Sequence, residues 1–98
     1  MNITKTMEGS RTVLALEGRL DTVTAPDLAA ELKSLDPDTA ELVLDLEKLE
    51  YVSSAGLRVL LQAKRFMAGR GTLAVTNVGE LVREVFDVTG FGKMLGIG

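Results

Sequence analysis

The feature that most constrains the fold is an alternation of short strand-like and helix-like segments, separated by turn residues. Residues 3–7 and 12–17 have strand patterns and flank the tight turn Glu8-Gly9-Ser10, which predicts a hairpin whose first strand lies at a sheet edge. Gly18 is predicted to end the second strand. Two further strands are predicted at residues 42–46 and 72–76.

Helical patterns fill the intervals between these strands. Thr24 is predicted to cap the first helix, with Pro26 in its first turn, and Asp36-Pro37-Asp38 stops it. The second helix is predicted to begin at Ser54 or Ala55 and to end at Gly69-Arg70-Gly71.

A third helix follows the last strand. Asn77 is predicted to cap it, with Glu80 as the reciprocal partner and Gly90 at its end. Residues 91–98 are expected to pack back on the sheet as a short helix or turn. The order β-β-α-β-α-β-α predicts one α/β domain over residues 1–98, with about four strands in a mixed, mostly parallel sheet packed with helices. The apolar run at residues 42–46 is typical of a strand covered on both faces, which predicts helices on each side.

Composition excludes several functional classes. The 98 residues suffice for one compact domain and include neither Cys nor His, so disulfides, thiolate metal sites and the usual general base are absent. We therefore expect no catalytic residue, metal or cofactor. A net charge of −3, without a basic stripe, argues against nucleic acid as a partner. The apolar runs are far shorter than the about 20 residues of a membrane helix, and the N-terminus lacks a signal-peptide core. A cytoplasmic location without membrane contact is expected.

The most informative segment joins the predicted third strand to the second helix through Ser53-Ser54-Ala55-Gly56. In sheets of this kind, functional groups gather beyond the carboxyl ends of the strands. Ser54 is predicted to be the N-cap of the second helix, a role that contributes about 1 kcal/mol. By itself, this serine would be an ordinary helix cap.

Three motifs along the chain suggest a functional interpretation of the two serines. They are Gly18-Arg19-Leu20-Asp21, then a stretch from Asp45 to Tyr51-Val52-Ser53-Ser54-Ala55-Gly56-Leu57, and finally Phe86-Asp87-Val88-Thr89-Gly90-Phe91. In this order they resemble the signature of the STAS domain family of anti-sigma factor antagonists. The resemblance covers essentially the whole chain and implies the STAS-like fold.

The resemblance implies a bacterial phosphorylation switch. Members of the family bind a kinase-type anti-sigma factor and displace the sigma factor from it. The kinase uses ATP to phosphorylate a serine of the antagonist, and a metal-dependent serine phosphatase resets the switch. The serine that matches is Ser54, while Asp21 matches an acidic residue near the kinase contact. Many members carry Asp where this chain has Ser53, which leaves Ser53 as an alternative phosphate acceptor.

The resemblance implies a partner-binding surface made of two segments of the chain. Its residues are Asp21, Thr22, Ser53, Ser54, Ala55, Gly56 and Arg58. The protein is expected to be a monomer.

Some of these residues also have structural interpretations. Asp21 could instead be a turn residue that bonds nearby backbone, and Asp45 is expected to tie the serine loop by hydrogen bonds rather than to contact a partner. Gly56 is expected where a side chain would obstruct close approach of backbone or partner.

Two other functional classes compete with the switch. An enzyme with Ser54 as nucleophile lacks a mechanism, because the chain has no His and no obvious lysine base beside the serine. The alternative that stays open is a stand-alone STAS subunit of another assembly: a stressosome, a transporter or a lipid-transport complex.

Overall fold

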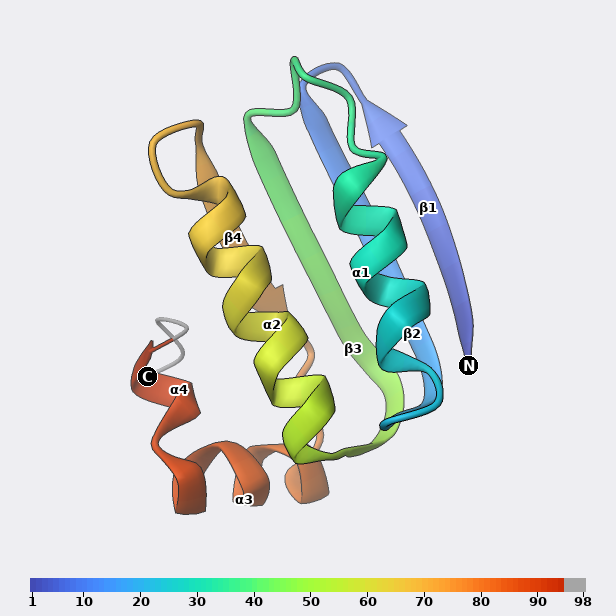
Figure 1. Ribbon diagram of the computed structural model, residues 1–98, viewed down its shortest axis with the longest axis vertical. Helices are drawn as coiled ribbons and strands as arrows, with labels where there is room; N and C mark the ends of the chain where they lie inside the picture. The colour runs from blue at the N-terminus through green and yellow to red at the C-terminus, as the bar shows by residue number, and fades with distance from the viewer. Residues whose placement is uncertain (95–98) are drawn as a thin grey trace.

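The computed structural model describes residues 1–94, which form a four-stranded sheet and four helices (Figure 1). The element order confirms the predicted β-β-α-β-α-β-α, with one short helix added. The elements are β1 (Asn2–Glu8), β2 (Arg11–Leu20), α1 (Ala25–Lys33), β3 (Glu41–Val52), α2 (Ser54–Met67), β4 (Thr72–Thr76), α3 (Glu80–Thr89) and α4 (Phe91–Met94).

The strands lie in the sheet in chain order, β1-β2-β3-β4, so β1 is an edge strand as predicted. β1 pairs with β2 antiparallel through the hairpin, while β2 with β3 and β3 with β4 are parallel. The register places Leu14 beside Leu44, and Leu44 beside Val75. These side chains form the layer of the core that lies on the sheet.

β3 is longer than the predicted strand and contains two irregularities. Its pairing with β2 shifts once between Ala15 and Glu17 and once between Gly18 and Arg19. At each shift β3 contributes one extra residue, which moves the following side chains to the opposite face. Three residues spaced by three therefore all join the core: Leu46, Leu49 and Val52. A search for apolar residues at every second position does not detect a strand with such irregularities.

β2 continues through Gly18 to Leu20, so the prediction that Gly18 ends this strand is wrong. Gly18 has φ +103°, a backbone conformation that residues with a Cβ rarely adopt, and it lies at the second irregularity. The strand can pass this point because glycine tolerates the distortion, and pairing with β3 resumes at Arg19.

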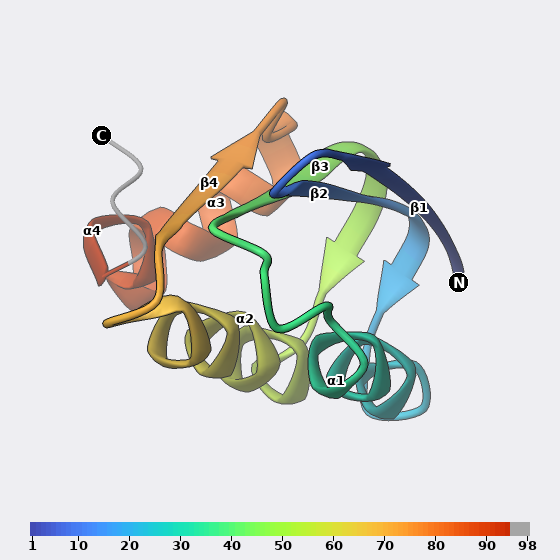
Figure 2. The same cartoon turned by 90° about the horizontal axis from the view of Figure 1, so that it is seen from above.

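α1 and α2 lie side by side on the same face of the sheet (Figure 2). The prediction of helices on each side of the third strand is therefore wrong for the first half of that strand. The apolar run arises differently: Leu42 and Leu44 face these helices, while Val43 points to the opposite face. Val43 is only 4% exposed because β3 is a central strand, with neighbours on both sides.

α3 contacts β3 and lies beyond the end of β4, which pairs with only the first residues of β3 (Figure 1). Its buried side chains are Val82 and Phe86, each 1% exposed. The prediction that Asn77 caps this helix is wrong, since Gly79 is the N-cap and no side chain caps the helix. Gly90 ends the helix, as predicted, and adopts the left-handed conformation.

The end of the chain agrees with the predicted short helix as far as the structure describes it. α4 covers Phe91–Met94 and packs mainly against α3 and α2, so the expected packing on the sheet is wrong for these residues. Residues 95–98 of the predicted tail lie outside the described residues. Over residues 1–94, every helix is too short or too polar to cross a membrane.

Candidate functional site

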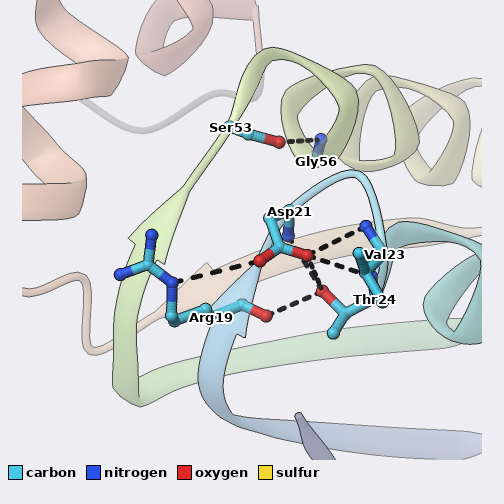
Figure 3. A network of polar contacts seen from close by, with 6 residues as sticks. All are labelled: Arg19, Asp21, Val23, Thr24, Ser53 and Gly56. Carbon is cyan, nitrogen blue, oxygen red and sulfur yellow. Dashed lines mark hydrogen bonds and ion pairs between the residues drawn. The ribbon is translucent and has the colours of Figure 1, made fainter.

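Two connections meet where the parallel strands β2 and β3 end. The backbone N–H of Ser53 donates a hydrogen bond to the carbonyl oxygen of Leu20, at 2.9 Å. This bond joins the start of α2 to the β2–α1 loop, and Figure 3 shows the two segments next to each other. The first and second sequence motifs are therefore neighbours in space.

Gly56 lets α2 approach this junction closely. A Cβ at this position would lie 2.7 Å from Cγ of Leu20 and 2.8 Å from the Leu20 carbonyl oxygen. It would also lie 2.9 Å from Cγ2 of Val52. The expectation that glycine permits a close approach is confirmed, and the approaching groups belong to β2 and β3.

Ser53, not Ser54, is the N-cap of α2, so the predicted cap is wrong by one residue. Ser53 has extended backbone, with φ −92° and ψ 175°, and its hydroxyl accepts a hydrogen bond from the N–H of Gly56 at 3.2 Å (Figure 3). The hydrogen bond from the Ser53 N–H to Leu20 holds Ser53 in the extended conformation of the strand. The helix therefore begins at Ser54.

The side chain of Ser54 is exposed, and within residues 1–94 its hydroxyl takes part in no hydrogen bond. Ser53 is only half-exposed, because it lies in the junction. Ser53 and Ser54 are neighbours of the same residue type, but their environments in the structure therefore differ.

The carboxylate of Asp21 organises the β2–α1 loop. Its Oδ1 accepts hydrogen bonds from the N–H groups of Val23, at 3.0 Å, and Thr24, at 3.1 Å (Figure 3). The Thr24 N–H, and after it the Val23 N–H, hold the pKa of the Asp21 carboxyl below its ordinary value. Oδ2 faces Nε of Arg19 at 3.9 Å. These bonds confirm the interpretation of Asp21 as a turn residue, while its contact with a partner stays a prediction.

Thr24 occupies the N-cap position of α1, but its side chain makes no capping bond, contrary to the sequence prediction. Its hydroxyl donates to the carbonyl oxygen of Arg19, at 2.7 Å, and accepts from the N–H of Asp21, at 2.8 Å. Because this hydroxyl is hydrogen-bonded to backbone groups inside the loop, it stabilises the loop and does not cap the helix.

Asp45 does not tie the serine loop, contrary to the sequence prediction. Its Oδ1 accepts hydrogen bonds from the N–H of Glu47, at 3.1 Å, and from Nδ2 of Asn77, at 3.0 Å. Asp45 pairs with Thr76 at the end of β4, so the residue after Thr76 lies beside it. The carboxylate therefore connects β3 to the β4–α3 segment, and the rest of β3 separates it from Ser53.

The other predicted site residues lie at the same junction. Thr22 and Arg58 are exposed, and Ala55 is half-buried in the first turn of α2. Sequence analysis missed two exposed apolar residues there, Val23 and Tyr51, of which Tyr51 lies under the guanidinium of Arg19 at 4.4 Å. The sequence did contain a signal for Val23, since this valine lies between the turn residues Asp21 and Thr24. An apolar residue in a loop belongs to no helix or strand pattern that would place it in the core.

Comparison with known proteins agrees with this arrangement. A family described as "Mlab, STAS domain" matches residues 3–96. The Bordetella bronchiseptica protein BtrV, which carries the name of an anti-sigma factor antagonist, is 42% identical over 81 residues, covering 81% of this chain and 70% of that protein. The anti-sigma-B factor antagonist of Bacillus subtilis is 29% identical over 83 residues, covering 84% of this chain and 76% of that protein.

The fold is also similar to a solved structure. The crystal structure of an anti-sigma factor antagonist from Mycobacterium paratuberculosis superposes with a TM-score of 0.82 at 25% identity, covering 95% of this chain and 80% of that one. Motifs, fold and relatives thus agree, and the chain belongs to the STAS domain family, in the group of anti-sigma factor antagonists.

Proposed function

We propose that the unphosphorylated chain binds a kinase-type anti-sigma factor in the bacterial cytoplasm and thereby frees the sigma factor. Phosphorylation of Ser54 by the same kinase ends the binding, and a serine phosphatase restores it. The observation that carries this proposal is the exposed Ser54 at the first position of α2, next to a serine that is already engaged as the cap.

Ser54 is the better phosphate acceptor of the two serines. The Ser53 hydroxyl oxygen holds the Gly56 N–H, and its backbone is tied to Leu20. A kinase that modified Ser53 would have to disrupt this cap, whereas Ser54 presents its hydroxyl without any rearrangement of the described residues.

A phosphate on Ser54 is compatible with the fold. It adds about −1.5 to −2 charge at neutral pH. The first turn of α2 contains no acidic residue, so this charge meets the positive end of the helix dipole without a like charge in that turn. The effect on the helix is favourable by about 0.3–1 kcal/mol.

The same charge is unfavourable in the complex. A partner surface that is complementary to a neutral hydroxyl must desolvate a near-dianion when the serine is phosphorylated. Phosphorylation therefore weakens binding without unfolding the chain, which is the property that a reversible switch requires.

We assign a regulatory role to Ser54, not a catalytic one. The chain contains no His. Across residues 1–94, no titratable side chain is hydrogen-bonded to either hydroxyl of the serine pair, so neither has the neighbouring base that activates a nucleophile.

The test is incubation with each kinase-type anti-sigma factor of the same organism and ATP, followed by mass spectrometry of the tryptic peptides. One phosphate on Ser54 is expected. Ser53→Ala is the matched control and is expected to accept the phosphate at Ser54, whereas Ser54→Ala is expected to accept none.

Binding is measured with the same purified kinases by calorimetry. Ser54→Ala is expected to bind as the wild type does, and Ser54→Asp is expected to fold and to bind more weakly. The proposal is overturned if no candidate kinase binds the chain or modifies this turn. Capture of a transporter or lipid-transport subunit instead would favour the alternative of a STAS subunit in another assembly.

A further inference from the structure

The β2–α1 loop presents an apolar side chain to solvent. Val23 is 82% exposed, although valine is usually buried. Its backbone is nevertheless held firmly, because its N–H donates to the Asp21 carboxylate at 3.0 Å. The loop is closed again behind it, since the N–H of Ala25 donates to the carbonyl oxygen of Asp21 at 2.7 Å. The valine is thus exposed on an ordered turn.

Two polar side chains near Val23, those of Asp21 and Thr24, are used inside the loop. Oδ1 of Asp21 accepts from two backbone N–H groups, and Oδ2 faces Arg19. The Thr24 hydroxyl bonds the carbonyl oxygen of Arg19. The side chains of Asp21 and Thr24 are therefore directed inward, and the exposed side chains that this turn offers to a partner are those of Thr22 and Val23.

Val23 also belongs to the loop that adjoins the proposed acceptor serine. The loop begins at Leu20, whose carbonyl oxygen accepts the Ser53 N–H at 2.9 Å, and Ser54 follows directly in the chain. A kinase has to bring its ATP to the Ser54 hydroxyl, so its surface extends over the adjoining loop. An apolar group in that position loses its contact with water when the complex forms.

We propose that Val23 is an apolar contact for the kinase-type anti-sigma factor, and that Asp21 is a positioning residue that orders the turn presenting it. This inference rests on the function proposed above and adds a specificity-determining residue to it. A pre-ordered turn favours binding because less conformational freedom is lost when the partner covers it.

The first test compares two valines of nearly equal exposure. Val23→Ala is expected to weaken binding of the wild-type kinase about tenfold, the size expected for removing two buried methyl groups. Val88→Ala is the matched control: Val88 is 87% exposed and lies in the second half of α3, and its truncation is expected to leave the affinity unchanged. Calorimetry gives both dissociation constants.

The second test separates positioning by Asp21 from direct contact. Asp21→Asn keeps an oxygen that can accept from Val23 and Thr24 but removes the charge, whereas Asp21→Ala removes both. Positioning predicts that the Asn variant binds within about threefold of the wild type, with an unchanged salt dependence, and that the Ala variant loses about tenfold or more. A direct ionic contact predicts that both variants lose affinity and that the salt dependence becomes weaker. Circular dichroism establishes that each variant is folded at the temperature used.

The outcomes distinguish this inference from the proposed function. If the wild type is bound and phosphorylated but Val23→Ala binds equally well, the valine contact is refuted and the switch stands. Equal losses in Val23→Ala and Val88→Ala would also refute it. Equal losses in the Asn and Ala variants of Asp21 would refute the positioning role. If no candidate kinase binds the wild type, the proposed function fails and the valine contact fails with it.

Discussion

The hydroxyl oxygen of Ser53 accepts a hydrogen bond from the backbone N–H of Gly56, at 3.2 Å, and so caps α2. The neighbouring Ser54 is exposed on the first helical residue. Many family members carry Asp at the position of Ser53, and Asp is also a favoured N-cap. A serine in this position therefore supplies a capping side chain as Asp would, and Ser54 stays exposed beside it.

Ser53→Ala tests the cap. Loss of the cap is expected to lower the free energy of unfolding by about 1 kcal/mol and Tm by about 4–8 °C, while Ser53→Asp is expected to stay close to the wild type. Thermal unfolding followed by circular dichroism measures both. Ser54→Ala is the matched control, with an expected change below about 0.5 kcal/mol, the usual limit for a surface substitution. A larger loss in Ser54→Ala than in Ser53→Ala would contradict the assignment of the cap.

Ser54→Asp tests the compatibility of charge with the fold. The variant is expected to be as stable as the wild type or up to about 1 kcal/mol more stable at low salt, because the new carboxylate lies at the positive end of the α2 dipole. The gain is expected to diminish as salt rises to 1 M, where charges are screened within about 3 Å. Urea unfolding at low and high salt measures it. A marked loss of stability would mean that phosphorylation acts by disrupting the domain.

Gly56→Ala tests the close packing at the junction. The added Cβ would lie under 3 Å from both Leu20 and Val52, which costs about 1–3 kcal/mol by overpacking. This outweighs the gain of about 1 kcal/mol that alanine offers inside a helix. A net loss of stability is expected in urea unfolding.

Gly79 offers the control for this substitution. It has φ −73°, and a Cβ there would meet no atom of the described residues within 4 Å, so Gly79→Ala is expected to change stability by less than about 1 kcal/mol. If Gly56→Ala and Gly79→Ala changed stability by the same amount, the close contact between α2 and Leu20 would not explain why residue 56 is glycine.

Asp21 makes the loop sensitive to acid. Its pKa lies lower in the folded state than the ordinary value of 3.8, so the folded state favours the charged carboxylate. The corresponding stability is complete above the unfolded pKa and is lost as the pH falls through the folded pKa, below about 4. Asp21→Asn has no such proton to bind and is expected to lose less stability than the wild type between pH 5 and pH 2. Thermal unfolding at a series of pH values measures the difference, and parallel profiles would contradict it.

The sequence by itself determined the order of the elements, the edge position of β1 and the glycine that ends α3. These features depend on residues that are near one another in the chain: turn glycines, apolar periodicity and the alternation of strands with helices. The three motifs also identified the correct family, because motif order does not depend on contacts.

The tertiary structure alone decided which serine caps α2, since the bond from the Ser53 N–H to Leu20 comes from a distant segment of the chain. Pairing between β2 and β3 likewise placed Leu49 and Val52 in the core through two irregularities that no period reveals. The partner of Asp45 is Asn77, which directly follows β4, rather than a residue of the serine turn. Propensity and periodicity describe neighbours in sequence, whereas a hydroxyl or carboxylate binds whichever donor the packed strands bring to it.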